Sequence, residues 1–373
     1  MKLGRPLQTS LRICDNWRKG RGGTFHANAL LRNSCGSAQQ DRQRRLFHYD
    51  RGLKLTKADL AVDFRRRQPR AFVSHAHSDH MARHEFAFCT PATSKLYQLR
   101  YGKRPTHDMP YRQPLEWGGL RLTAYPAGHC LGSAMLLAED GDASLLYTGD
   151  FKLDESATAE RAELPGADIL VMETTYGNPL YRHTPRHLAL EQLYTKVAEA
   201  LAAGATPVVE AYVLGKSQEV TRLLTSQGFP VLQHPKIYAV SQVYRACGVD
   251  LGDCHVYPGK PLPGHVVVVP PRFHRVGLLP GLKRTVTFAV TGWAMHERTK
   301  YRLGVDHAIP LSDHADYDQL FAAVEQVAPR VIYCTHGPTS FVSCLRAAGL
   351  NAHPLDGSVV AEVDPPTRQL SLF

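Results

Sequence analysis

The chain has 373 residues, enough for one large core or two modest ones, because domains usually contain about 100 to 200 residues. Its 44 lysine and arginine residues outnumber 34 aspartate and glutamate residues, and the net charge of +10 favours a polyanionic partner, with nucleic acid the leading candidate. Eight cysteines without close pairs argue against a disulfide framework and against a four-cysteine zinc site, and they indicate a reducing, cytoplasmic setting. The sequence has no apolar run long enough to cross a bilayer and no signal-type segment, so no membrane partner is expected.

The first third of the chain predicts a basic arm followed by short strands. Residues 1–45 are rich in Arg, Gly, Ser and Asn and lack a sustained apolar period, so we expect a flexible arm, with phosphate contact or targeting as its functional alternatives. Apolar runs predict strands at 47–49, 53–55, 58–64 and 71–73. The third run closes on Asp63, and the fourth leads into the segment HAHSDH at 75–80. Residues 81–84 are expected to open a helix.

Several later strands end beside polar side chains. Apolar runs predict strands at 120–126, 134–138, 144–148, 168–173 and 330–335. The polar residues that close or follow them are His129, Asp150, Glu173 and His336. His314 lies in a turn at 308–316, before a helix expected at 317–327. The chain therefore delivers chemically active side chains at strand ends again and again.

The middle of the chain has a different pattern, typical of βα units with a parallel sheet. Helices are expected at 187–203 and 216–226, and strands at 207–213, 265–269 and 285–291. We expect this region, 176–302, to form a separate α/β module. The triplet at 215–217 fails as a phosphate-binding loop, because the required earlier glycine would fall at Glu210. Exposed charge is the favoured interpretation of Lys216, with phosphate contact as the alternative, and Tyr176 is either a base-stacking or a packed aromatic residue.

The HAHSDH segment predicts a metal site, because a solvated loop seldom repeats imidazole at i and i+2. On an extended segment His75 and His77 point to one side, and Asp79 and His80 lie past the bend, where they can face a second ion. Mixed imidazole and carboxylate donors suit zinc better than calcium or magnesium. Two zinc ions about 3.5 to 4 Å apart would activate water and stabilise charge on a phosphoryl or carbonyl oxygen.

The remaining ligands must come from elsewhere, and His129, Asp150 and His336 each follow a strand with glycine beside them. His314 is a candidate general acid, and Glu173 is a candidate carboxylate that orients it. Each histidine alone is more often a surface or hydrogen-bonded residue, and Glu173 alone is a candidate helix cap; the shared strand-end context favours the ligand or catalytic interpretation. Without that context, other histidines are expected to be structural: His84, His107, His183 and His187.

These motifs resemble those of a known family. Asp63, HAHSDH, His129 in AGHCLGSA and Asp150 in YTGD resemble the four hydrolase motifs of the metallo-β-lactamase fold. The three added motifs of the β-CASP nucleases are similar to Glu173 in METTYG, His314 in LSDHAD and His336 in CTHG. TGWA at 291–294 and SDHAD are similar to the bacterial ligase-associated DNA exonuclease branch. The resemblance spans 46–357.

The resemblance implies an α/β fold, a metallo-β-lactamase αββα sandwich with an inserted β-CASP α/β cap domain. The implied division is an arm at 1–45, a lactamase domain at 46–175 and 303–363, a cap at 176–302 and an exposed tail at 364–373. It also implies two zinc ions, with manganese as the alternative. His75, His77 and His129 would hold one ion, Asp79, His80 and His336 the other, and Asp150 would bridge. Asp63 would orient the ligand loop from outside the ligand set.

The last residues resemble a partner-binding peptide. The sequence QLSLF is similar to the bacterial sliding-clamp-binding peptide, in which a glutamine and two hydrophobic side chains fill a cleft on the clamp. The binding residues would be Gln369, Leu370, Leu372 and Phe373. Apolar groups on an extended tail favour such a partner, and a last strand folded back on the lactamase sheet is the alternative. The family resemblance also implies association with a DNA ligase or a helicase.

Together the motifs predict a di-zinc metallonuclease that hydrolyses DNA phosphodiester bonds, an exonuclease in repair or replication-linked processing. A β-CASP ribonuclease is the alternative, because RNA-processing members also carry a histidine at the position of His336. A non-catalytic nucleic-acid-binding protein would need a broken ligand set, and every ligand position is occupied here. A thioesterase or lactamase acting on small molecules would lack the cap and the basic balance.

Overall fold

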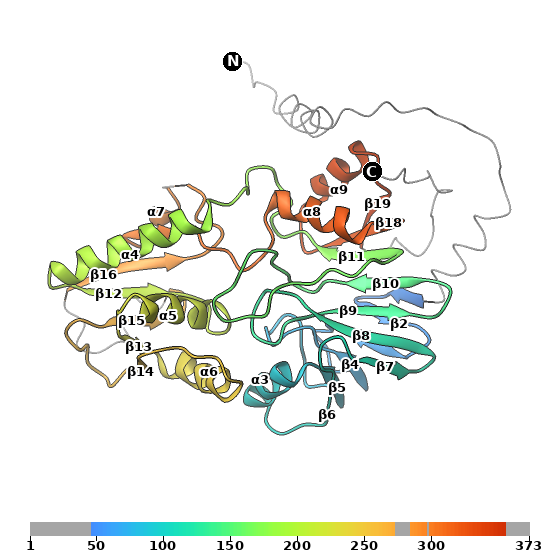
Figure 1. Ribbon diagram of the computed structural model, residues 1–373, viewed down its shortest axis with the longest axis horizontal. Helices are drawn as coiled ribbons and strands as arrows, with labels where there is room; N and C mark the ends of the chain where they lie inside the picture. The colour runs from blue at the N-terminus through green and yellow to red at the C-terminus, as the bar shows by residue number, and fades with distance from the viewer. Residues whose placement is uncertain (1–45, 273–283, 297, 356–373) are drawn as a thin grey trace, which may run out of the picture.

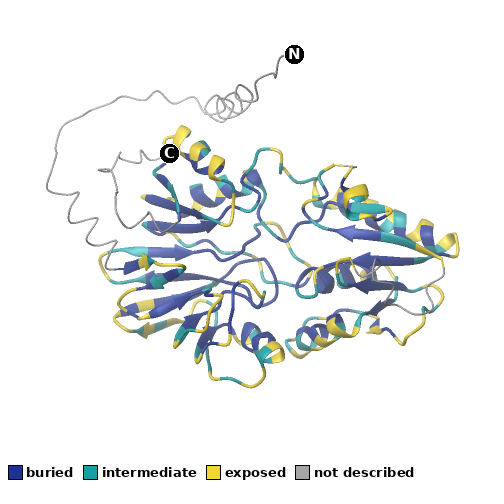
Figure 2. Cartoon of the chain, turned by 180° about the vertical axis from the view of Figure 1, so that it is seen from behind, coloured by how far each residue is buried: buried dark blue, intermediate teal, exposed yellow. Residues whose placement is uncertain are grey.

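The computed structural model describes residues 46–272, 284–296 and 298–355 (Figure 1). The predicted arm at 1–45 lies outside the described residues, as does the tail with Gln369, Leu370, Leu372 and Phe373. The described part has two bodies side by side, with the ligand-bearing loops where they meet. Buried strands form the centre of each body, and exposed residues concentrate on helices and loop tips (Figure 2). No helix in the described part of the chain is long and apolar enough to span a membrane.

The first sheet is built from the N-terminal strands. β1 to β3 are antiparallel, and β3 to β6 are parallel. The strands are β1 (Phe47–Tyr49), β2 (Leu53–Leu55), β3 (Leu60–Val62), β4 (Arg70–Phe72), β5 (Phe86–Cys89) and β6 (Thr106–Asp108). Helix α3 (Pro91–Tyr101) follows β5, and it begins at Pro91 because the Thr90 side chain accepts a hydrogen bond from the Thr93 amide.

The second sheet faces the first. Its strands are, in sheet order, β19 (Ala352–Pro354), β18 (Val331–Thr335), β11 (Ile169–Glu173), β10 (Ser144–Tyr147), β9 (Ala134–Glu139), β8 (Leu120–Pro126) and β7 (Pro114–Trp117). Apolar residues of both inner faces, such as Phe72 and Leu136, form one core. On the outer face, α8 (Tyr317–Val327) and α9 (Thr339–Ala347) pack against β11 and β18. This is the αββα sandwich that was predicted.

The third sheet is wholly parallel, as the middle region predicted. Its strands are, in sheet order, β14 (Cys254–Val256), β13 (Val231–Gln233), β15 (Val266–Val269), β12 (Thr206–Glu210), β16 (Thr285–Val290) and β17 (His307–Ile309). Its helices are α4 (Arg186–Ala202), α5 (Lys216–Ser226), α6 (Pro235–Ala246) and α7 (Thr299–Leu303). Strand β17 pairs with β16, so this sheet extends past the predicted boundary at residue 302.

The two bodies share apolar contacts. The third sheet and its helices form the second body, called the third unit below. Leu96 and Leu131 of the sandwich belong to the same buried cluster as Leu193 and Val220 of this third unit. The backbone amide of Leu131 also donates a hydrogen bond of 3.3 Å to the hydroxyl of Tyr244 in α6. The cap-like unit is therefore packed against the sandwich and is not merely tethered by linkers.

Some local predictions were wrong. No helix opens at 81–84, because the backbone there is held by Tyr97: the amide of His84 donates to its hydroxyl, which donates to the carbonyl of Ala82. The strand expected to reach Val213 ends at Glu210. Helices α3, α6, α7 and α9 were not predicted, although Pro235 in the first turn of α6, capped by the His234 side chain, is a start signal.

Candidate metal centre

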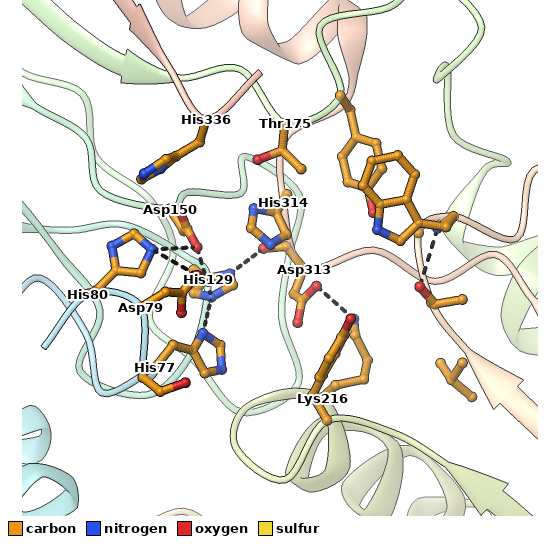
Figure 3. A pocket seen from close by; sticks show the side chains of 17 residues that line it. His77, Asp79, His80, His129, Asp150, Thr175, Lys216, Asp313, His314 and His336 are labelled. Carbon is orange, nitrogen blue, oxygen red and sulfur yellow. Dashed lines mark hydrogen bonds and ion pairs between the residues drawn. The ribbon is translucent and has the colours of Figure 1, made fainter. Parts of the chain in front are cut away.

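The predicted ligands gather because neighbouring strands end at the same edge of the second sheet. β10, β11 and β18 are adjacent and parallel, and they lead into Asp150, Glu173 and His336, respectively. β8 leads into His129 at the same face. The HAHSDH loop follows β4 of the facing sheet and brings its histidines to this edge (Figure 3). Side chains far apart in the sequence thus meet in one place.

The first donor group consists of His75, His77, His129 and Asp150, whose ligand atoms lie within 4.8 Å of one another. Nε2 of His75 and Nε2 of His129 lie 3.6 Å and 3.9 Å from Oδ2 of Asp150. Nδ1 of His77 lies 3.0 Å from Nε2 of His129. Three imidazoles and a carboxylate in this space form a mixed set of the kind that holds a transition metal ion.

The second donor group consists of His80, Asp150 and His336, again within 4.8 Å. Nε2 of His80 lies 3.3 Å from Oδ2 of Asp150, so this carboxylate belongs to both groups, as a bridging ligand would. Asp79, predicted for the second ion, belongs to neither group among the described residues. Its side chain is 55% exposed, and its Oδ2 lies 3.9 Å from Nε2 of His80.

Each histidine of the HAHSDH loop, and also His129, has one ring nitrogen held by a hydrogen-bonding neighbour. The partners are the Ser74 hydroxyl for His75, the Leu214 carbonyl for His77, the Asp63 carboxylate for His80 and the Asp313 carbonyl for His129. The four held nitrogens lie 2.8 to 3.1 Å from these oxygens. A hydrogen bond to one nitrogen fixes the ring and leaves the other free for a ligand.

The electrostatics of the cluster fit a bound cation. Burial, with the nearby histidines, lowers the pKa of His75 well below its usual value, and it lowers the pKa of His129 to about 3. Both rings are thus neutral, the form that binds metal. Burial alone would lower the pKa of His80. Asp150 and Asp63 outweigh burial and raise this pKa well above its usual value, because the two carboxylates stabilise positive charge beside them.

One buried atom also indicates a missing partner. Nε2 of His75 is buried and has no hydrogen-bond partner in the described part of the chain. Leaving a buried polar atom unsatisfied costs about 1–3 kcal/mol. A divalent ion between His75 and Asp150 would satisfy that nitrogen, so the donor set fits a metal centre.

Asp63 holds the ligand loop from behind. One oxygen accepts a hydrogen bond from the Ser74 amide at 2.8 Å, and the other accepts from the hydroxyls of Ser74 and Tyr147 and lies 2.8 Å from Nδ1 of His80. With this many partners, the carboxylate is placed to orient the loop. The sequence offered no signal for Ser74 or Tyr147, whose contribution depends on these long-range contacts.

Glu173 and His314 form a buried pair beside Asp150. Oε1 of Glu173 lies 2.8 Å from Nδ1 of His314 and also accepts the Phe151 amide at 3.0 Å. The other oxygen accepts from the hydroxyl and amide of Thr175. Burial lowers the pKa of His314, but Glu173 and Asp150 outweigh it and raise the pKa to about 10. Nδ1 is fixed by Glu173, so Nε2 is free to donate a proton.

A cavity of about 330 Å³ opens over these groups. Except for His75, the residues of the two ligand groups line it together with His314, and the body built on the third sheet contributes Tyr212, Lys216, Gly292 and Trp293. Tyr212 and Trp293 are exposed aromatic residues, whereas Tyr176 is buried. Its ring lies 4.7 Å from that of Trp293, between centroids, so the packed interpretation of Tyr176 holds. Metal ligands and aromatic groups therefore share one cavity.

The favoured interpretation of Lys216 was wrong. Its side chain is buried, with Nζ 3.3 Å from Oε2 of Glu219 and 3.8 Å from Oδ1 of Asp313. Glu219 also pairs with Lys152 of the sandwich and with Arg186 of α4. These charged residues were missed because no local pattern marks them. Asp313 directly precedes His314 in the motif SDHAD, so its position beside a predicted catalytic residue could have indicated a role at the site.

Three of the histidines expected to be structural make ordinary contacts, and Nε2 of the fourth, His183, is buried without a hydrogen-bond partner among the described residues. The ring nitrogens of His84 face the amides of Gln68 and Ala82, each at 3.2 Å. His107 packs on Phe88. His183 lies against Tyr176, and His187 is exposed on α4.

Comparison with known proteins adds an independent observation. No protein-family model matches the chain. A protein of Opitutus terrae named "Probable DNA ligase" is 38% identical over 308 residues, which cover 82% of this chain. The "Cleavage and polyadenylation specificity factor subunit 3" of Dictyostelium discoideum is 33% identical over 37% of this chain, and the "RNase aCSPSF2" of Saccharolobus solfataricus is 34% identical over 32%.

The chain belongs to the β-CASP branch of metallo-β-lactamase-fold proteins. It spans 30% of the length of the Opitutus terrae relative, 18% of the Dictyostelium discoideum relative and 25% of the Saccharolobus solfataricus relative. A solved structure from Enterococcus faecalis, a protein of unknown function, matches 77% of this chain and 79% of its own with a TM-score of 0.55 at 14% identity, which supports the fold alone. In this β-CASP chain the third sheet lies in the region for which a separate α/β module was predicted.

Proposed function

We propose that the chain is a two-metal phosphodiesterase that cleaves DNA as an exonuclease in repair or replication-linked processing. The observation that carries the proposal is the pair of donor groups sharing Asp150, with His314 at their edge. His75, His77 and His129 would hold one ion, and His80 and His336 the other, with Asp79 beside them. Zinc suits this donor set best, and manganese is the alternative. When bound, two such ions supply a nucleophile from water and neutralise charge on the phosphate.

The side chains of the protein take the remaining roles. His314 is placed to donate its Nε2 proton to the departing sugar oxygen, because Glu173 holds Nδ1 at 2.8 Å and the raised pKa keeps the ring protonated at neutral pH. Glu173 keeps the ring in the donating orientation. The exposed rings of Tyr212 and Trp293 in the same cavity suit stacking on nucleobases. Asp63 keeps the ligand loop in position.

DNA is the preferred substrate because the Opitutus terrae relative, named as a DNA ligase, matches over most of this chain. RNA is the second candidate, because shorter matches carry names of ribonucleases, including "Endoribonuclease YSH1" of Yarrowia lipolytica at 34% identity over 37% of the chain. The same proposal makes residues 176–302 a cap that closes over the nucleic-acid strand. It also includes a cytoplasmic location.

One assay separates these alternatives. The zinc- or manganese-loaded protein is incubated with end-labelled single-stranded DNA, duplex DNA and RNA of one sequence, beside the variants His314→Ala and His129→Ala. The exposed His187→Ala is the matched control. We expect DNA to be shortened progressively from an end by the wild type and the control, and not by the site variants. Preferential RNA cleavage would overturn the DNA assignment, and full activity of either site variant would overturn the assigned site.

The partner proposals rest on sequence resemblance alone. The peptide from Gln369 to Phe373 would bind a bacterial sliding clamp, and the ligase-named relative makes a DNA ligase a candidate partner beside a helicase. A pull-down of clamp by the full chain and by a chain lacking those five residues tests the first idea. Equal recovery of clamp would reject it.

A further inference from the structure

A second cavity adjoins the candidate metal centre. It has a volume of about 500 Å³, and Asp79 and His336 line both it and the first cavity. The rest of its wall comes from the turn between β1 and β2, from the segment after β3 and from the end of β18. None of the predicted roles uses this space. The two cavities therefore share a wall at Asp79 and His336.

Three arginines line this second cavity: Arg51, Arg65 and Arg66. The side chains of Arg51 and Arg65 are 79% and 63% exposed. Arg66 is also exposed and makes no hydrogen bond or ion pair within the described residues. The wall has two carboxylates, and Asp63 among them is buried and engaged with the ligand loop. Arg51 lies 3.8 Å from the exposed Asp50 and Arg65 lies 4.0 Å from Asp79, so Arg66 is the arginine of this wall with no carboxylate partner among the described residues.

The backbone segments that carry the arginines are held close to the metal ligands. Nε of Arg65 donates a 3.0 Å hydrogen bond to the carbonyl of Asp79 in the HAHSDH loop. Arg65 and Arg66 follow Asp63 after one residue, so the segment that carries them is held from the same point as His80. On the opposite wall, a Cβ at Gly52 would lie 2.4 Å from the Phe64 ring, so the β1–β2 turn is packed directly on that segment.

Backbone strain concentrates at this cavity. Among the described residues, seven non-glycine residues have positive φ, and three of them, Arg51, Asp63 and His336, line it. Their φ angles are 56°, 50° and 55°. A side chain in the left-handed region is unfavourable, and such residues persist where surrounding structure enforces them, often at functional sites. Arg51 therefore shares with Asp63 and His336 a conformation that the surrounding structure enforces at this cavity.

We propose that the second cavity binds the phosphodiester backbone of the strand that extends beyond the scissile bond. This inference rests on the proposed function, and it adds a subsite to it: Arg51 and Arg66 contact successive phosphates as the strand continues past His336. Guanidinium groups suit phosphate oxygens because their donors form a fork of matching geometry. Exposed arginines on a fixed wall suit a strand that slides after each cut, because the contacts read charge and not sequence.

The test compares two double variants of equal charge. Arg51→Ala with Arg66→Ala removes the cavity arginines but leaves Arg65, which holds the ligand loop. Arg100→Ala with Arg121→Ala removes two exposed arginines of α3 and β8 and serves as the control. Binding of labelled single strands of about 4 and about 20 nucleotides, DNA and RNA of one sequence, is measured with chelator present over a range of salt concentrations. Hydrolysis of bis(p-nitrophenyl) phosphate by the metal-loaded protein is measured separately.

We expect the cavity double variant to bind the long strand roughly tenfold more weakly, with a salt slope lower by about 1.4, because each contact to a single strand contributes about 0.7. The short strand and the small phosphodiester should be handled as by the wild type. Behaviour equal to the control, an equal loss for the short strand, or no strand binding by the wild type would overturn the proposal. The strand-binding result can be as expected while neither the wild type nor the variants hydrolyse the small phosphodiester. In that case the proposed function is wrong and the phosphate subsite is retained.

The strain at Arg51 gives a second readout. Asn adopts the left-handed region more readily than Arg, so Arg51→Asn should leave the melting temperature unchanged or raise it while weakening long-strand binding. If Arg51 only stabilised the β1–β2 turn, its replacement would not weaken long-strand binding while the melting temperature stayed the same or rose. Loss of stability together with unchanged binding would overturn the role of Arg51.

Discussion

Two buried clusters of ionisable side chains lie near the junction of the bodies, and they are built on opposite principles. Around Asp150, histidines are held through one nitrogen and turn the other inward, and Nε2 of His75 finds no partner among the described residues. Around Glu219, three cations lie 2.8 to 3.4 Å from the carboxylate: Lys152, Arg186 and Lys216. The first cluster leaves a ligand nitrogen without a partner, and the second surrounds its carboxylate with cations.

The difference teaches how to separate a site from a scaffold. Burial alone raises the pKa of Glu219, but Lys152, Lys216 and Arg186 lower it to about 2, so the group stays ionised and satisfied. At Asp150 the rings differ: burial keeps His75 and His129 neutral by lowering the pKa of each, whereas nearby carboxylates raise the pKa of His80 and of His314. Neutral imidazoles with a free ligand nitrogen mark the place for a metal ion, and a carboxylate surrounded by three cations marks a structural link between the two bodies.

The largest effect should come from His314. His314→Ala is expected to lower kcat by about 10²–10⁴-fold, the usual contribution of a positioned acid, while leaving the bound metal content unchanged. Steady-state kinetics and metal analysis of the purified variant check this. Glu173→Gln should shift the upper limb of the pH–rate profile to lower pH, because the Glu173 carboxylate raises the pKa of His314. A variant with wild-type kcat would show that His314 is not the acid.

The second cluster should respond in stability. Glu219→Gln leaves Lys152 and Lys216 buried without their counter-charge, so the free energy of unfolding should fall by about 3–5 kcal/mol. Glu199→Gln, which breaks the exposed pair with Lys196, is the control and should change it by less than about 1 kcal/mol. Urea unfolding followed by circular dichroism measures both. Equal changes in the two variants would contradict the distinction between the clusters.

His84 offers a pH test away from both clusters. Burial lowers its pKa from 6.5 to about 4, although Asp63 opposes this, and both ring nitrogens face backbone N–H groups that would repel an added proton. Its stabilising contribution is complete above the unfolded pKa of about 6.5 and is lost as pH falls toward 4, by about 3 kcal/mol in total. Urea unfolding of wild type and His84→Gln between these pH values checks the slope. Identical slopes would reject the assignment.

The smallest effect concerns Asp63. Asp63→Asn removes the charge that orients His80, and metal affinity should fall by about 10–100-fold, as for other groups behind a ligand. Asp59→Asn is the matched control, since Asp59 also has positive φ but forms only an exposed pair with Arg70. Competition with a chromophoric chelator measures the affinity. An equal fall in both variants would remove Asp63 from its positioning role.

Periodic patterns were reliable where one face of an element alone decides its structure. The strands at 47–49 and 53–55 and the helices at 216–226 and 317–327 have the predicted bounds. Predictions failed where a distant group intervenes: at 81–84 the hydroxyl of Tyr97 takes the backbone bonds that a helix would have used. The prediction of an exposed Lys216 was wrong for a similar reason. Its sequence neighbours do not indicate that the side chain is buried against the carboxylates of Glu219 and Asp313.

The sequence by itself determined which donors the chain offers, because imidazole and carboxylate groups placed directly after apolar strands are a local property of the chain. It also determined the order of motifs that marks the β-CASP branch. Only the tertiary structure decided which nitrogen of each histidine is held, that Asp79 lies outside both donor groups, and that cations surround Glu219. Arg51 likewise acquires its place beside His336 only through folding. These are contacts between strand ends and loops far apart in the chain, and no local pattern encodes them.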